Sequence, residues 1–232
     1  MNSKYYEIRY KFAFPGGSSH EFELLLDEST MSLVNFNGES RPPWTKLSYK
    51  QCSCCTLAED RHLYCPIAVN IAELVDNFKD RQSIDACLVK CATPERTCMK
   101  ETTVQAGLYS ILGVVMATSD CPAMSFYKPM ARFHLPFSTT KETLFRSASV
   151  YLLHQYFEYK HGRKPDMEME KLGKKLRQVQ QVNSGILSRI RGISARDADA
   201  NALIILDSFS KLFEMDIENS LSSLEYLFLT EE

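Results

Sequence analysis

The sequence lacks any hydrophobic run long enough to cross a membrane. The most apolar stretch, residues 104–117, contains polar side chains and is shorter than the roughly 20 residues that a membrane-spanning helix needs. The first residues alternate and carry charge, whereas a signal peptide would have an apolar core there. We therefore expect a cytoplasmic protein that has no membrane segment.

The sequence also lacks a large excess of charge and the common catalytic motifs. Its 232 residues carry a formal net charge of −2, whereas general nucleic-acid binding needs a cationic surface. Glycine-rich dinucleotide and phosphate loops are missing, as are the paired-histidine motif of zinc proteases and the serine nucleophile elbow. We therefore expect no nucleic-acid partner and favour a role other than catalysis.

The apolar pattern predicts an α+β fold that begins with a small antiparallel β-sheet. Alternating apolar residues predict strands over residues 5–14, 21–26 and 30–36. A second group of strands is predicted over residues 83–91 and 96–102, after a cysteine-rich loop. The sheet should bury one side against the helices that are predicted between and after these strands.

Helical spacing of apolar residues predicts helices over residues 66–79, 104–118, 140–160 and 165–193. The last of these has one apolar stripe with steps of three or four, which is typical of a helix that packs lengthwise against another helix. Small side chains on one side of the second helix indicate that another backbone approaches there, and they are Ala106, Ser110, Gly113 and Ala117.

We divide the chain into an α+β, cysteine-rich domain over residues 1–136 and a helical region over residues 137–232, which can also pack as one unit. Residues 163–191 carry eight basic and three acidic side chains, whereas residues 197–232, where a further helix is predicted, carry nine acidic and one basic. The opposite charges should bring these two helical segments together, either within one chain or between two chains. The C-terminal helices are thus predicted to contact a protein partner or a second copy.

Four of the eight cysteines lie in residues 51–66, which indicates a metal centre. Cys52 and Cys55 form a C-x-x-C step, and one turn can offer both thiolates to zinc. Cys65 can join them by folding back over a short loop. In a reducing compartment, clustered cysteines are more often metal ligands or redox groups than disulfides. We interpret the chain as a zinc-stabilised binding or regulatory module that acts through protein contacts.

The fourth ligand is left open by the spacing. His62 would close a purely local site, at low entropic cost. Cys121, in the other Cys-Pro pair of the chain, would tie a distant segment to the site. Cys54 is adjacent to Cys55 and is expected to point away from a shared centre. Three alternatives to zinc stay open. The thiols could hold an iron–sulfur cluster, form a dithiol redox pair, or simply be buried and pack as small hydrophobic side chains.

Arg132 and His134 are the candidate catalytic residues outside the cysteines. They lie in residues 126–137, where prolines and aromatic side chains alternate irregularly. Arg132 could bind an anionic ligand while His134 carries a proton, which together with the cysteines would make a redox sensor or enzyme. In the interpretation that we favour, hydrogen bonds of both side chains fix an irregular loop.

Three segments resemble an uncharacterised bacterial protein family, a domain of unknown function. They are QCSCCTLAEDRHLYCPIA, TVQAGLYSILGVVMATSDCP and KPMARFHLPF. The cysteines of the resembling pattern fall on four residues, Cys52, Cys55, Cys65 and Cys121. The resemblance implies no activity, and it favours Cys121 over His62 as the fourth ligand. Asp120 stands where the pattern has glycine and Lys128 where it has arginine, so we expect the backbone before Cys121 to differ slightly.

Overall fold

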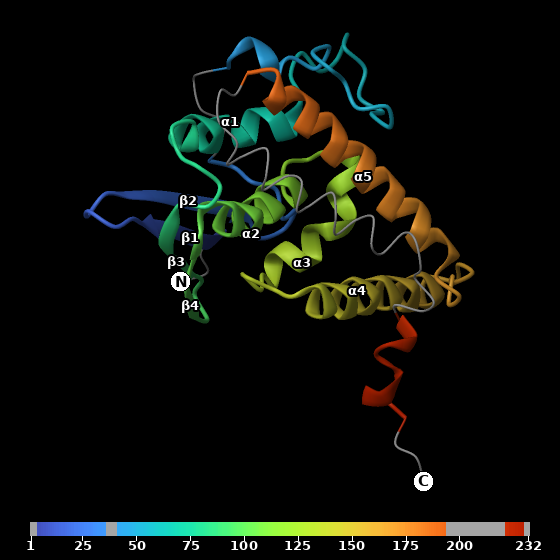
Figure 1. Cartoon of the computed structure of the whole chain (residues 1–232). Coiled ribbons are helices and arrows are strands. Elements are labelled where there is room, and N and C mark those ends of the chain that lie inside the picture. Colours follow the sequence, from blue (N-terminus) through green and yellow to red (C-terminus); the bar gives the residue numbers. More distant parts are fainter. Residues whose placement is uncertain (1–3, 36–40, 194–220, 230–232) are drawn as a thin grey trace.

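The computed structural model describes residues 4–35, 41–193 and 221–229, and its centre is one four-stranded antiparallel β-sheet. The strand order is β2-β1-β3-β4 (Figure 1). The strands are β1 (Tyr5–Ala13), β2 (Ser19–Asp27), β3 (Ala86–Ala92) and β4 (Thr97–Thr103). Together with the helices this confirms the predicted α+β fold.

The alternation of side chains along β1 gives the sheet one apolar face and one charged face. The buried residues of β1 are Tyr6, Ile8, Tyr10 and Phe12. On the opposite face Lys11 of β1 forms an ion pair with Glu21, its register partner on β2, at 2.6 Å. The helices therefore pack on the apolar face, here called the inner face, because covering the charged face would remove water from charged groups.

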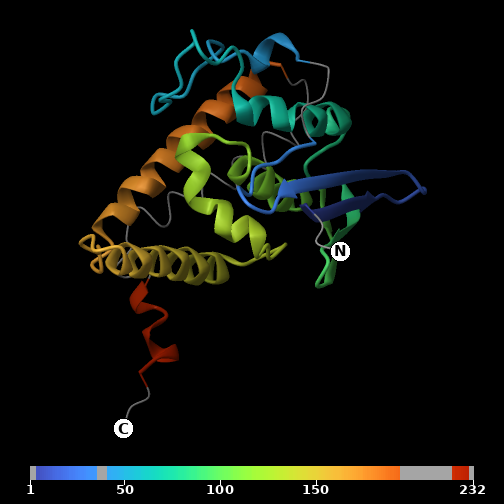
Figure 2. The ribbon, with the colours of Figure 1, turned by 180° about the vertical axis from the view of Figure 1, so that it is seen from behind.

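Two helices cover the inner face of the sheet (Figure 2), α1 (Pro66–Phe78) and α2 (Val104–Ala117). The ring of Phe78 in α1 packs on the ring of Phe12, with ring centroids 4.9 Å apart. Gly107 lets α2 approach the sheet closely, because an added Cβ would lie 2.5 Å from a ring carbon of Phe12. The short helix η1 (Pro43–Thr45) precedes the cysteines.

The chain then passes through η2 (Pro122–Tyr127) and α3 (Lys128–Arg132) into the long helices α4 (Thr140–Lys160) and α5 (Glu170–Arg191). Helix α5 runs diagonally past η2 and α1. Six residues of its predicted stripe are confirmed as buried, Leu172, Leu176, Val179, Asn183, Ile186 and Ile190. The last predicted member, Ile193, lies beyond the end of α5 and is exposed. Several side chains of α5 therefore belong to the same core as the sheet. The division at residue 136 stays a prediction.

Helix α4 begins with a capping box, in which Thr139 and Glu142 exchange hydrogen bonds between side chain and backbone. Its inner side packs against the beginning of α5 and against Leu224, which precedes the short helix η3 (Glu225–Leu227). Among the described helices, none is long and apolar enough to cross a membrane. The helix that the sequence predicts beyond residue 194 lies outside the described residues.

The strand predicted over residues 30–36 is wrong. Asp27 ends β2 by accepting hydrogen bonds from two backbone N–H groups that follow it, each at 3.0 Å, and Met31 adopts a φ of 56°. A single bridge between Leu26 and Leu33 is the β-pairing that remains there. The aspartate turns the chain, so the apolar alternation that follows does not continue as a ladder.

Candidate metal centre

The cysteine-rich segment lies beside the start of α1, the start of η2 and the middle of α5, and side chains from all four line a cavity of about 130 Å³. The four cysteines of the resembling pattern, named here the cysteine quartet, all line it: Cys52, Cys55, Cys65 and Cys121. His62 is exposed and is not among the described lining residues. The structure thus brings Cys121 to the other predicted thiols from a distant part of the chain.

The quartet shares a cavity without forming a coordination shell. No group of three or more His, Cys, Asp or Glu side chains in the described part of the chain is arranged as a metal site. Metal binding therefore stays a prediction. The donor chemistry suits zinc, because structural zinc sites commonly take four thiolates.

The two Cys-Pro pairs of the quartet are built alike. Cys65 precedes α1 and Cys121 precedes η2, and in each case proline occupies the start of the helix, where its missing N–H costs nothing. Burial raises the pKa of Cys121 to about 11, while the backbone N–H of Ala123 acts in the opposite direction. Burial also raises the pKa of Cys65, against the N–H groups at the start of α1. Both helix starts thus direct N–H groups toward a thiol.

The C-x-x-C step is a turn that packs on α5. The backbone N–H of Cys55 donates to the carbonyl oxygen of Cys52 at 3.0 Å. Gly185 of α5 makes room for the turn, because an added Cβ there would collide with the sulfur of Cys52. Burial, and to a smaller extent the neighbouring thiols, raise the pKa of Cys52 to about 12. Cys54 also borders the cavity, but its thiol donates to the carbonyl oxygen of Gln178 at 3.5 Å.

Arg189 of α5, which the sequence did not single out, is fully buried and holds the segment before the cysteines. Its guanidinium donates at 2.7 to 2.9 Å to the carbonyl oxygens of Trp44, Lys46 and Leu47. All three acceptors are neutral, so the charge is solvated by carbonyl dipoles. Burial raises the pKa of both Cys52 and Cys65, and the charge of Arg189 acts to lower it. A buried cation therefore lies near the thiols.

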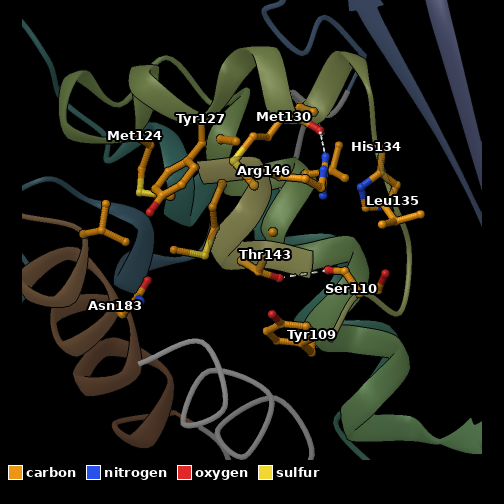
Figure 3. A pocket seen from close by; sticks show the side chains of 17 residues that line it. Tyr109, Ser110, Met124, Tyr127, Met130, His134, Leu135, Thr143, Arg146 and Asn183 are labelled. Carbon is orange, nitrogen blue, oxygen red and sulfur yellow. Dashed lines mark hydrogen bonds between the residues drawn. The ribbon is translucent and has the colours of Figure 1, made fainter. Parts of the chain in front are cut away.

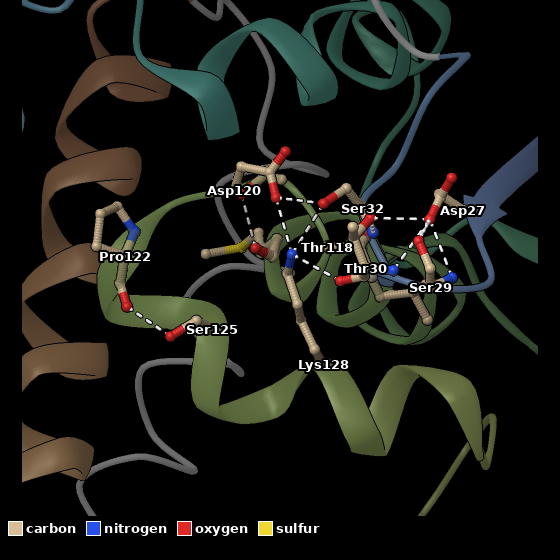
Figure 4. A network of polar contacts seen from close by, with 12 residues as sticks. Asp27, Ser29, Thr30, Ser32, Thr118, Asp120, Pro122, Ser125 and Lys128 are labelled. Carbon is tan, nitrogen blue, oxygen red and sulfur yellow. Dashed lines mark hydrogen bonds and ion pairs between the residues drawn. The ribbon is translucent and has the colours of Figure 1, made fainter.

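The two departures from the resembling pattern contact each other just before Cys121 (Figure 4). Asp120 has a φ of 63°, a conformation that favours glycine. Its carboxylate accepts hydrogen bonds from Lys128 at 2.8 Å and from Ser32 at 2.6 Å. Burial acts to raise the pKa of Asp120, but these hydrogen bonds outweigh it and lower the pKa. Aspartate thus adopts a backbone conformation that favours glycine, and its side-chain contacts stabilise it. The expected difference from the backbone of the resembling pattern stays a prediction.

The two candidate catalytic residues contact different side chains. The guanidinium of Arg132 lies 3.9 Å from the ring centroid of Tyr6 and 3.4 Å from the carboxylate of Glu95. His134 points inward, with its Nε2 atom 2.5 Å from the hydroxyl of Tyr10. Burial lowers the pKa of His134 to about 3, so the ring is neutral. Neither residue is among the described side chains that line the thiol cavity.

Comparison with curated proteins and with solved structures found no match to the chain. The model of one protein family matches residues 8–229, which is nearly the whole sequence. The family is described as a domain of unknown function, which is the kind of family that the sequence was expected to resemble. The chain belongs to the family of the domain of unknown function DUF6901.

Proposed function

We propose that the chain is a metal-stabilised binding or regulatory module in which the cysteine quartet holds one structural zinc ion. The observation that carries the proposal is that thiols from the C-x-x-C turn and from both Cys-Pro pairs line one small cavity. A zinc ion there would join the start of α1, the start of η2 and the loop on α5. It would stabilise the fold, because the unfolded chain has no such site.

The buried charge of Arg189 supports a thiolate-rich centre. Four thiolates around Zn²⁺ give a group with a net negative charge, and a buried group of this kind needs a nearby counter-charge. The hydrogen bonds of Arg189 go to neutral carbonyl oxygens, so its positive charge is available to balance such a group. The N–H groups at the two helix starts favour negative sulfur as well.

A thiol redox centre is the second candidate, and the geometry favours it less. Reactive C-x-x-C pairs have at least one thiol whose pKa is lowered. Burial instead raises the pKa of Cys52 to about 12. Neither Arg132 nor His134 is among the described residues at the cavity. An iron–sulfur cluster would use the same thiolates as zinc, and metal analysis separates the two.

The test is elemental analysis of the full chain purified without oxygen, together with its absorption spectrum. We expect one zinc per chain and no visible absorption. Removing the metal with a chelator should lower the Tm by about 8 to 16 °C, because ligand at a thousandfold excess over its Kd contributes about 4 kcal/mol and each kcal/mol is worth about 2 to 4 °C at this size. A brown protein that contains iron and sulfide would replace zinc by an iron–sulfur cluster.

Three variants identify the ligands. Cys121→Ser should lose zinc and show the low Tm of the stripped protein. Cys98→Ser is the matched control, because Cys98 lies on β4 and is not among the described residues at the cavity. His62→Ala should keep its zinc. A Cys121→Ser protein with full zinc content would show that the quartet is wrong, and loss of zinc in His62→Ala would assign the fourth position to His62.

We further propose that the module acts through protein contacts made by its C-terminal helices. Helix α4 exposes three large side chains on one face, Leu153, Tyr156 and Phe157, each at 50% or more of its free surface. Exposed apolar side chains that lie together on one helix face are typical of surfaces that bind other proteins.

A further inference from the structure

We infer that a second cavity, lined by residues of α2, η2, α3, α4 and α5, binds a small organic acid with one carboxylate and an apolar body of about the size of benzene. The cavity measures about 130 Å³, and methionines from three elements contribute to its apolar wall, Met116, Met124 and Met130 (Figure 3). Buried apolar cavities of about 150 Å³ bind benzene. The volume therefore limits the apolar body to roughly one six-membered ring.

Gly113 in α2 is the first observation that supports a ligand. An added Cβ there would meet no atom within 4 Å, so the glycine faces open space in the cavity. The helix glycines Gly107 and Gly185 are different, because an added Cβ would collide with Phe12 in one case and Cys52 in the other. Glycine weakens a helix interior relative to alanine. At Gly107 and Gly185 close packing requires glycine. At Gly113 no neighbour requires it, and the glycine leaves the cavity open.

Arg146 of α4 is the second observation, and it sets the charge of the ligand. Among the described residues that line the cavity it is the one charged side chain, since His134 is neutral. Its Nη2 atom donates to the carbonyl oxygens of Met130 at 2.9 Å and Phe133 at 2.8 Å. Both acceptors are neutral. The carboxylate of Glu142, one turn earlier on α4, is engaged in the capping box and also acts electrostatically on Arg146, but it is exposed and is not among the described lining residues. One cation in an apolar wall matches a monoanion, and a guanidinium binds a carboxylate well.

Tyr127 of η2 adds a hydrogen-bond donor on another wall. Burial raises its pKa, so the hydroxyl stays protonated. Within the described part of the chain its hydroxyl makes no hydrogen bond, and Figure 3 shows it on the side of the cavity where Asn183 lies. His134 and Ser110 already hydrogen-bond to Tyr10. The guanidinium of Arg146 and the hydroxyl of Tyr127 thus favour an anion that can also accept a hydrogen bond from an uncharged donor.

The experiment compares three probes that share one ring, benzoate, benzyl alcohol and benzylamine, by calorimetry or NMR titration of the full chain with matched zinc content. Benzoate should bind at least about tenfold more tightly than benzyl alcohol, because a hydrogen bond to a charged group contributes more than a neutral one. Benzylamine should bind more weakly than either. Equal affinities of benzoate and benzyl alcohol, or no binding of benzoate, would overturn the inference.

Two variants place the binding in this cavity. Gly113→Leu adds a side chain where the cavity is open, so it should weaken benzoate binding at least about tenfold while the fold is kept. Arg146→Gln removes the charge and keeps a donor for the carbonyl oxygens, so benzoate and benzyl alcohol should then bind alike. Unchanged benzoate affinity in Gly113→Leu would show that the probe binds elsewhere, and this result remains decisive if Arg146→Gln does not fold.

Discussion

Replacing Gly185 by alanine should destabilise the protein and weaken zinc binding together. The added Cβ would collide with the sulfur of Cys52 and would lie 3.2 Å from its Cβ and 3.3 Å from its Cα. Carbon atoms in contact prefer separations of about 3.5 to 4.0 Å. The sulfur can rotate away, but the backbone of Cys52 must also move by a few tenths of an ångström. This movement displaces the first thiol of the quartet.

The expected size of the effect is the difference between two opposing terms. Exchanging glycine for alanine inside a helix stabilises by about 1 kcal/mol when the site is open. Overpacking a close contact costs about 1 to 3 kcal/mol. The matched control is Gly113→Ala, whose Cβ would meet nothing within 4 Å. We therefore expect the free energy of unfolding to be lower in Gly185→Ala than in Gly113→Ala by about 1 to 3 kcal/mol.

Urea unfolding of both variants, once with zinc and once after chelation, measures this difference. Competition with a coloured chelator gives the zinc affinity, which should fall in Gly185→Ala and stay unchanged in Gly113→Ala. The reasoning is refuted if Gly185→Ala is as stable as Gly113→Ala, because the turn would then not pack on α5 as described.

Two further results are expected. The pKa of His134 is about 3 in the folded protein and 6.5 ordinarily, so the unfolded chain binds more protons between these values and stability falls as the pH drops through that window. When the pH is lowered from about 7.5 to about 5, the free energy of unfolding measured with urea should fall by about 2 kcal/mol more in the wild type than in His134→Gln. Equal decreases in the two proteins would show that His134 does not have a lowered pKa in the folded state. Because α4 exposes Phe157 beside Tyr156, light scattering should show a mass that rises with concentration, less so in Phe157→Ser. A constant monomer mass speaks against self-association.

The periodicity of apolar residues was sufficient to predict a strand or helix where one face of the element is buried along its whole length. The alternation over β1 and the stripe along α5 predicted both elements, because one face of each is buried throughout. It failed where one side chain redirects the backbone. Residues 30–36 alternate like a strand, yet Asp27 turns the chain before them.

The small residues of α2 show a second limit. Their spacing predicted the close approach of another backbone, and at Gly113 this is wrong, since that position faces a cavity. Small residues indicate space, but the sequence does not say whether a neighbour or a ligand fills it. Gly107, six residues earlier on the same helix, is the glycine that the sheet approaches.

The candidate site was only partly predictable. The turn of Cys52 and Cys55 follows from spacing, whereas the arrival of Cys121 depends on topology and was favoured by the family resemblance. Arg189 was counted only among the eight basic residues of the segment 163–191. Its spacing from Val182 and Ile186, seven and three residues, places it on the buried face of α5 and was the available signal.

The thiol cavity and the second cavity share a wall, because neighbouring residues of η2 and of α5 line one cavity or the other. Along η2, Ala123 borders the thiols while Met124 borders the other chamber, and along α5 the same is true of Val182 and Asn183. Any displacement of this wall alters both chambers, and linkage then makes the influence of one occupant on the other mutual and equal in free energy. If zinc binds as proposed, two preparations that differ in metal content should also differ in their affinity for the proposed small-molecule ligand.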